Sequence, residues 1–192
     1  MAKIVGTQEK ETVIDEMAST IAAWSLSTAR TLFADMYEVM MEEGITPEQN
    51  YRVHLEILTF FLLDFERYAV GRGGEEFLDM VLNETVNEAI ALVLDELRLD
   101  SEESQEEKLD HALDYYNSAA ADYDSCQVLV EKKRDYDGSK TVLGRLGFRI
   151  AKALGKLPVP EITDMVAVVA AEALAESELK QKVSEVYSQV SQ

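Results

Sequence analysis

The chain has one cysteine, three prolines and nine glycines among its 192 residues. A single cysteine excludes an intrachain disulfide and favours a reducing compartment, so we expect a cytoplasmic protein. The scarcity of proline and glycine disfavours an all-β fold, which needs frequent turn residues.

Long apolar runs are also lacking. The longest, MVAVVAAEALA, already contains Glu172, and it falls well short of the roughly 20 residues that span a bilayer. The first residues turn polar early, so we expect no signal peptide.

Patterns of catalytic and metal-binding residues are lacking as well. No GxxxxGK phosphate loop occurs, and the chain has only two histidines. Carboxylate-bridged metal bundles need Glu three residues before His, but Tyr51 precedes His54 and Lys108 precedes His111 at that spacing. We therefore expect no metal, no cofactor and no set of catalytic residues, and we favour a non-enzymatic protein.

What the chain does have is an apolar pattern of helical period along nearly its whole length. This pattern predicts an all-α fold, a bundle of about six or more helices. With 47% hydrophobic residues, the chain can bury one sizeable core, so we expect a single helical domain over 1–192. The polar stretch near 98–104 is a candidate subdomain joint, and the ends, 1–7 and 189–192, are expected to fray.

Local signals predict where these helices begin and end. Gly44 follows the first apolar stripe and is expected to end that helix. Thr46 is expected to cap the second helix, with Pro47 at its first position, and the GRGG stretch at 71–74 should end it. The predicted helices are 8–43, 47–70, 75–97, 104–134, 141–157 and 161–188.

The second helix, 47–70, is apolar over more than half of its circumference, which is typical of a central helix. His54 lies within its apolar arc and Asp64 at the edge of that arc, one turn before Tyr68. These three residues form a candidate buried polar site for a small molecule or for proton transfer. The favoured interpretation is structural, with each polar group satisfied by an internal hydrogen bond. The side of the helix predicted to be polar carries Arg52, Glu56, Thr59, Glu66 and Arg67.

Charge is the most uneven property of the chain. Its net charge is -19, yet residues 132–156 hold eight of the 18 basic residues and two of the 37 acidic ones, so that segment carries +6. The other 167 residues therefore carry -25. On a helical wheel, residues 142–157 separate into an apolar arc, a narrow basic stripe and a strip of small residues that would let another backbone approach.

Three interpretations of the basic helix stay open. In the first, its apolar arc is buried in the bundle and its cations face water or nearby carboxylates. In the second, it lies on an anionic membrane surface as a peripheral anchor. In the third, it contacts a protein partner, which is our preferred function. Nucleic acid is disfavoured as a partner because the global negative charge opposes it, and a homo-oligomer is left open. The predicted contact residues are Arg145, Phe148, Arg149, Lys152 and Lys156.

Overall fold

The structure is a computed structural model that describes residues 7–35, 44–97, 103–126, 140–156 and 160–190. These residues form an all-α fold of packed helices with no β-strand among them. The expected number of helices, the central position of 47–70 and the single domain stay predictions. The helices are α1 (Thr7–Asp35), α3 (Pro47–Leu97), α4 (Gln105–Tyr123), α5 (Val142–Ala153), α6 (Pro160–Glu176) and α7 (Leu179–Val190).

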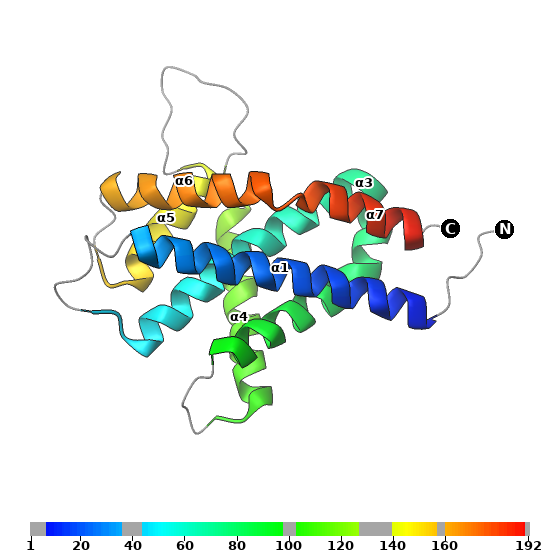
Figure 1. Ribbon diagram of the computed structural model, residues 1–192, viewed down its shortest axis with the longest axis horizontal. Helices are drawn as coiled ribbons and strands as arrows, with labels where there is room; N and C mark the ends of the chain where they lie inside the picture. Colours follow the sequence, from blue (N-terminus) through cyan, green and yellow to red (C-terminus); the bar gives the residue numbers. More distant parts are fainter. Residues whose placement is uncertain (1–6, 36–43, 98–102, 127–139, 157–159, 191–192) are drawn as a thin grey trace, which may run out of the picture.

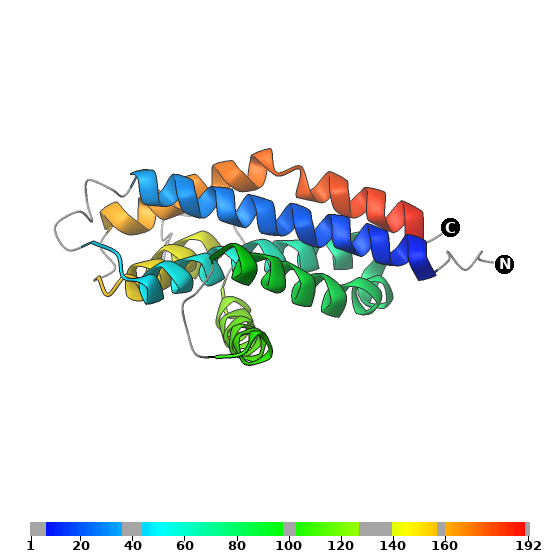
Figure 2. The same ribbon diagram turned by 60° about the horizontal axis from the view of Figure 1, so that its bottom comes forward.

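The two arms of α3 run beside each other, and α1 lies across them with α6 and α7 alongside (Figures 1 and 2). The turn between the arms occurs at Gly74, whose φ of 73° and ψ of -171° interrupt the helix. A positive φ suits glycine because glycine has no Cβ. The break predicted within GRGG is therefore confirmed at its last residue.

The predicted start of α3 is also confirmed. Thr46 Oγ1 accepts a hydrogen bond from the Gln49 amide, and Gln49 Oε1 accepts one from the Thr46 amide, which is a reciprocal capping box. Gly44 adopts a φ of 72°, and the end predicted for the first helix, at residue 43, is not among the described residues. Residues 36–43 lie outside the described residues, as do the 98–102 part of the expected joint and the extreme ends 1–6 and 191–192.

Three predicted helix bounds are wrong. Helix α4 ends at Tyr123, with Asp124 as its C-cap, and most of the predicted continuation (127–134) lies outside the described residues. The last helix, predicted as one, is two, because Glu178 adopts a φ of 52° and the Ser177 hydroxyl accepts from the Leu179 amide. The basic helix α5 ends at Ala153 rather than at residue 157.

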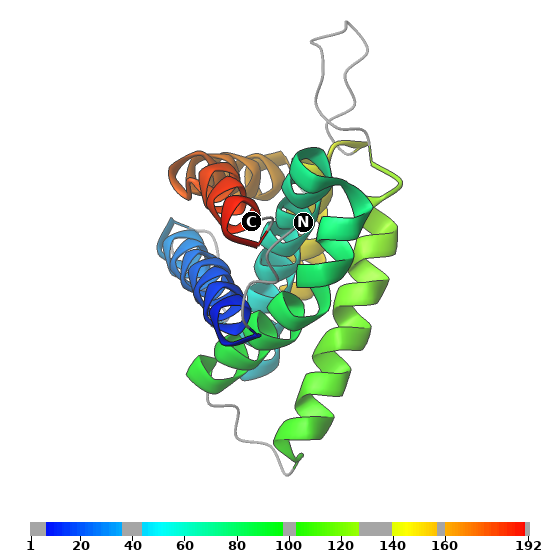
Figure 3. The ribbon, with the colours of Figure 1, turned by 90° about the vertical axis from the view of Figure 1, so that its right-hand side faces the viewer.

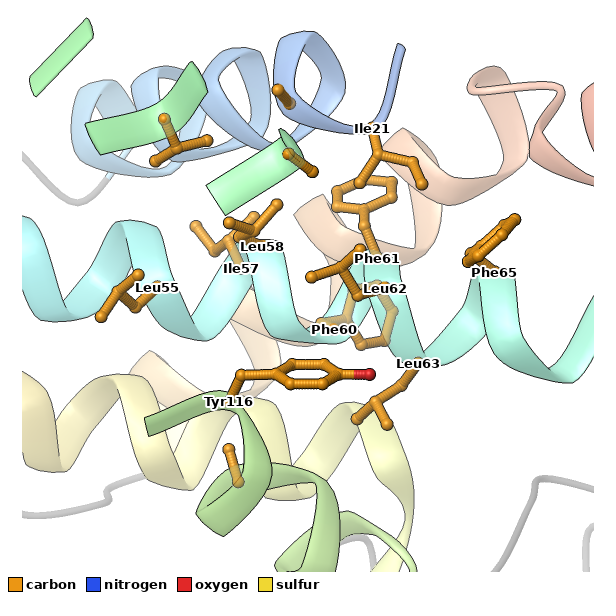
Figure 4. Close-up of a cluster of buried hydrophobic side chains, with 14 of the residues drawn as sticks. Ile21, Leu55, Ile57, Leu58, Phe60, Phe61, Leu62, Leu63, Phe65 and Tyr116 are labelled. Atoms are coloured by element: carbon orange, nitrogen blue, oxygen red, sulfur yellow. The ribbon is translucent and has the colours of Figure 1, made fainter. Parts of the chain in front are cut away.

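The first arm of α3 supplies much of the core. Phe61, Leu62 and Phe65 are completely or almost completely buried, and Figure 4 shows their side chains among those of the neighbouring helices. Burial on this arm extends to the side that was predicted to be polar, where Glu56 and Thr59 are also buried. None of the helices among the described residues is both long enough and apolar enough to cross a membrane.

Candidate functional site

Helix α5 is held at both ends by its own sequence. The Thr141 hydroxyl accepts from the Gly144 amide at 3.0 Å and caps the first turn. At the other end, Gly155 adopts a φ of 70°, and the Lys156 amide donates to the Ala151 carbonyl at 2.9 Å. This is a Schellman turn. Lys156 therefore lies in the turn after the helix, half-buried, and not on the basic stripe where the wheel placed it.

Most of the described part of the α5 apolar arc is buried, and Leu143 and Ala153 are partly buried. Val142, Leu146 and Ile150 all belong to the core, where the helix packs against α3 and α6. Gly147 makes the closest approach: a Cβ at this position would lie 2.7 Å from the Thr163 carbonyl oxygen of α6 and 2.8 Å from the Thr163 Cα. The small-residue strip of the sequence thus allows a close helix-helix contact, which offsets the helical cost of glycine.

Arg149 points into the molecule and pairs with two carboxylates. Its Nε donates to Glu56 Oε2 of α3 at 2.8 Å, and one of its Nη atoms donates to Asp122 Oδ2 of α4 at 3.1 Å. The Arg149 side chain is only 17% exposed and that of Glu56 only 2%. One guanidinium group therefore joins α3, α4 and α5 through charge-assisted hydrogen bonds.

Two tyrosines of α4 complete the surroundings of this ion pair. The Tyr115 hydroxyl donates to Glu56 Oε1, and the Tyr123 hydroxyl lies 3.4 Å from Glu56 Oε2. The Arg149 guanidinium carbon lies 5.6 Å from the ring centroid of each tyrosine, within cation-π range. Burial, followed by the charge of Glu56, raises the pKa of both phenols far above the usual tyrosine value. Both hydroxyls therefore stay protonated and act as donors.

The charge state of Arg149 is equally fixed. Burial by itself lowers the pKa of a guanidinium, but the hydrogen bond and charge of Glu56 outweigh that effect and raise the pKa of Arg149 above its ordinary value. We call Glu56, Tyr115, Asp122, Tyr123 and Arg149 the ionic cluster. A permanently charged arginine paired with a buried carboxylate joins the three helices.

Glu56 is one of four residues of this cluster that the sequence interpretation did not place in a site, and the others are Tyr115, Asp122 and Tyr123. A wheel of 47–70 places it on the polar side, and a glutamate there is expected to face water. The signal that could have found it is the basic stripe of 141–157, because cations on a helix with a buried apolar arc need carboxylates nearby. One sequence does not say which of the 37 acidic residues supplies them.

Arg145 lies at the rim of the ionic cluster. One of its Nη atoms is 3.6 Å from Asp122 Oδ1, and its guanidinium carbon is 5.7 Å from the Phe148 ring centroid. The side chain remains about one-third exposed, so this pair is weaker than the buried one. Asp122 thus faces both arginines of α5.

Two of the predicted contact residues are open to solvent. Phe148 is 37% exposed, a large value for phenylalanine, and Lys152 is exposed one turn further along the same helix. Residues four apart are neighbours on a helix surface. The five predicted contact residues are thus divided: Phe148 and Lys152 face outward, Arg149 faces inward, Arg145 lies between the two groups and Lys156 lies in the turn.

His54, predicted as part of a polar site, is a buried residue of the core. Its Nδ1 donates to the Asn50 carbonyl one turn earlier at 2.8 Å, and its ring centroid lies 5.7 Å from that of Phe33 on α1. Burial lowers the pKa of His54; the Asn50 carbonyl opposes this shift and the charge of Arg30 adds to it. This arrangement matches the structural interpretation of the histidine, and its imidazole is held neutral.

Asp64 and Tyr68 lie together, but far from His54. Burial raises the pKa of Asp64, against the opposing effects of the Arg67 charge and the Tyr68 hydroxyl, which lies one turn further along the helix. Asp64 Oδ2 is buried with no hydrogen-bond partner among the described residues. Ten residues of helix separate Asp64 from His54, which is about 15 Å along the axis. The structure therefore does not bring the three predicted residues into one site.

Across the part of the chain that the structure describes, no group of three or more His, Cys, Asp and Glu side chains is placed to hold a metal ion. The tightest convergence of charged side chains is the ionic cluster, and next to it lies the outward surface of α5. Comparisons with protein-family models, with curated proteins and with solved structures found no match for this chain, so the function of this region has to be inferred from its own geometry.

Proposed function

We propose that this chain is a non-enzymatic helical protein of the cytoplasm that works by contacting another protein through α5. The observation that carries the proposal is the division of this helix. Its apolar arc is mostly buried, with Leu146 and Ile150 inaccessible to solvent, yet Phe148 is 37% exposed. A phenylalanine left outside a helix that is otherwise well buried is a candidate anchor for a partner.

The chemistry around Phe148 indicates what kind of partner fits. Lys152 follows it by one turn and is exposed, and the partly exposed guanidinium of Arg145 lies beside the ring. An aromatic ring flanked by cations fits an apolar pocket with carboxylates at its rim. We call Phe148, Lys152 and the exposed part of Arg145 the α5 surface.

Site-directed photocrosslinking tests this proposal. p-Benzoylphenylalanine replaces Phe148 in one protein and, as the matched control, Val168 of α6 in another, because Val168 is also apolar and is 56% exposed. We expect a discrete adduct from position 148 that position 168 does not form. Lys152→Glu should abolish it while the circular dichroism spectrum stays unchanged. No adduct, or the same adducts from both positions, would contradict the proposal.

Lys152 is the position to reverse because it carries no internal role that the structure shows. Reversing Arg149 would place two negative charges together at a buried position, since Glu56 lies 2.8 Å away. Loss of binding after that change would report unfolding as readily as loss of a contact.

The two alternatives from the sequence have less support. A peripheral membrane anchor needs apolar side chains to insert, and among the described residues of α5 Phe148 is the one large apolar side chain that is exposed. Flotation of the protein with anionic liposomes at low salt would restore this alternative. A small-molecule site at His54, Asp64 and Tyr68 needs these residues to converge, and about 15 Å of helix separates the first two. Binding of a small-molecule fragment that shifts the His54 imidazole resonances would restore the small-molecule alternative.

A further inference from the structure

Helix α4 lies at the outside of the bundle, as Figure 3 shows. Each of the other described helices packs closely against at least two helices, whereas α4 packs mainly against α3. Four of its nineteen residues are buried, and two of these, Ala112 and Ala119, are alanines. The other described helices thus pack against one another directly, without α4 between them.

Polar contacts supply much of what holds α4 in place. Tyr116 is buried against α3, with its ring near Leu63 (Figure 4), and its hydroxyl donates to Glu66. Tyr115 donates to Glu56, and Asp122 pairs with Arg149. Helix α4 also begins with a capping box of its own at Ser104 and Glu107, so its helical structure is stabilised locally. Apart from two alanines, the apolar side chains that α4 buries are Tyr116 and Tyr123. A locally stabilised helix that packs mainly against one neighbour is of the kind that opens as a unit.

Asp122 connects α4 to the α5 surface. Its two carboxylate oxygens lie 3.1 Å from Arg149 and 3.6 Å from Arg145. The bond from Arg149 Nε to Glu56 joins α5 to α3 and involves no atom of α4. Asp122 of α4 therefore pairs with one Nη atom of Arg149 and one of Arg145, and the Arg145 guanidinium lies beside the ring of Phe148.

We propose that α4 is an autoinhibitory strap, whose Asp122 occupies in cis the arginines that α5 would offer to a carboxylate of its partner. This inference rests on the proposed function of the α5 surface. In the closed state the surface offers Phe148, Lys152 and one partly exposed arginine. In the open state it also offers the Nη groups of Arg149 and the whole guanidinium of Arg145.

The strap controls affinity through a simple competition. An acidic partner must displace Asp122, which is tethered and thus present at a high effective concentration. The apparent affinity for the partner is reduced by the fraction of molecules in which α4 is open. Any change that loosens α4 without altering α5 should therefore strengthen partner binding.

Tyr116→Phe is the change that isolates the strap. It removes the hydroxyl bond to Glu66, keeps the buried ring and touches no residue of α5. Tyr187→Phe, the same loss of one oxygen on α7, is the matched control. In hydrogen exchange we expect the amides of α4 to exchange by a local opening, faster than those of the first arm of α3. Tyr116→Phe should speed α4 exchange by roughly ten-fold, and Tyr187→Phe should leave it unchanged. Exchange of α4 at the same rate as α3, in both proteins, would overturn the strap.

Photocrosslinking from position 148 then separates the two proposals. In the Tyr116→Phe background we expect a higher yield of the partner adduct than in the otherwise native chain. An unchanged yield together with faster α4 exchange would overturn the autoinhibitory role and leave the contact function of α5 standing. An adduct in neither protein would overturn the contact function, and with it the inference that depends on it.

Discussion

Replacing Arg149 with methionine should destabilise the protein more than any other single change at the ionic cluster. Methionine keeps much of the apolar stem but leaves the Glu56 carboxylate, 2% exposed, without a cation. Removing one partner of a buried ion pair costs about 3–5 kcal/mol. The Tyr115 and Tyr123 hydroxyls still lie at hydrogen-bonding distance from Glu56, so we expect a loss near the lower end, about 3 kcal/mol.

Removing Glu56 instead of Arg149 should cost less free energy of unfolding. The difference between the two losses is therefore a second test of the prediction. In Glu56→Leu, Arg149 keeps its ion pair with Asp122 at 3.1 Å, and its side chain is 17% exposed. Its charge therefore still has a partner and some contact with water. We expect a loss of about 1–2 kcal/mol. The double variant buries no unpaired carboxylate and should recover most of the loss of Arg149→Met, because apolar replacements of a whole buried pair are often tolerated.

Urea denaturation followed by circular dichroism measures these differences as a double-mutant cycle. The slope of the free energy of unfolding against urea concentration must be the same in all four proteins for the comparison to hold. A loss below about 1 kcal/mol for Arg149→Met would refute the reasoning, because a surface salt bridge would behave in that way. Equal losses for the two single variants would refute the proposed asymmetry.

Two further changes test the packing of α5 and the state of the buried histidine. Gly147→Ala should lower the free energy of unfolding by about 1–3 kcal/mol, because its Cβ would meet the Thr163 backbone at 2.7 Å. Gly71→Ala is the control, because a Cβ at that position would meet open space. It should raise the free energy of unfolding by up to about 1 kcal/mol in the same urea titration. Burial lowers the pKa of His54, so below about pH 6.5 the unfolded chain binds a proton that the folded chain does not. Stability should therefore fall as the pH drops from 6.5 towards 5, by at most about 1.4 kcal/mol per pH unit. His54→Leu should remove that part of the slope, and an identical slope in both proteins would contradict a buried neutral imidazole.

Features that depend on a few neighbouring residues were predictable from the sequence. The cap at Thr46 and the break within GRGG need only local backbone chemistry, and the structure has both. The break at Glu178 was not predictable in the same way. No glycine or proline marks it, and the apolar period continues through it. A glutamate with a φ of 52° is unusual.

Of the five residues in the ionic cluster, the sequence interpretation assigned a site role to Arg149 alone. The basic stripe of 141–157 identified Arg149 as a residue of interest, but it could not say whether the side chain turns outward or inward. That choice depends on a carboxylate of α3 and another of α4, 93 and 27 residues away in the sequence. A helical wheel describes one helix, and it assigned Glu56 to solvent because it has no knowledge of the helices that cover it.

Nuclear magnetic resonance of the arginine side chains gives the most direct test of the inward orientation of Arg149. Arg52 is the internal reference, because it also pairs with a glutamate at 2.7 Å but is 52% exposed. We expect the Arg149 Nε–H to exchange slowly with water and its Nη protons to appear as separate signals, with both features lost in Glu56→Gln. Fast exchange and averaged Nη signals for Arg149, like those expected for Arg52, would contradict a buried ion pair that joins α3, α4 and α5.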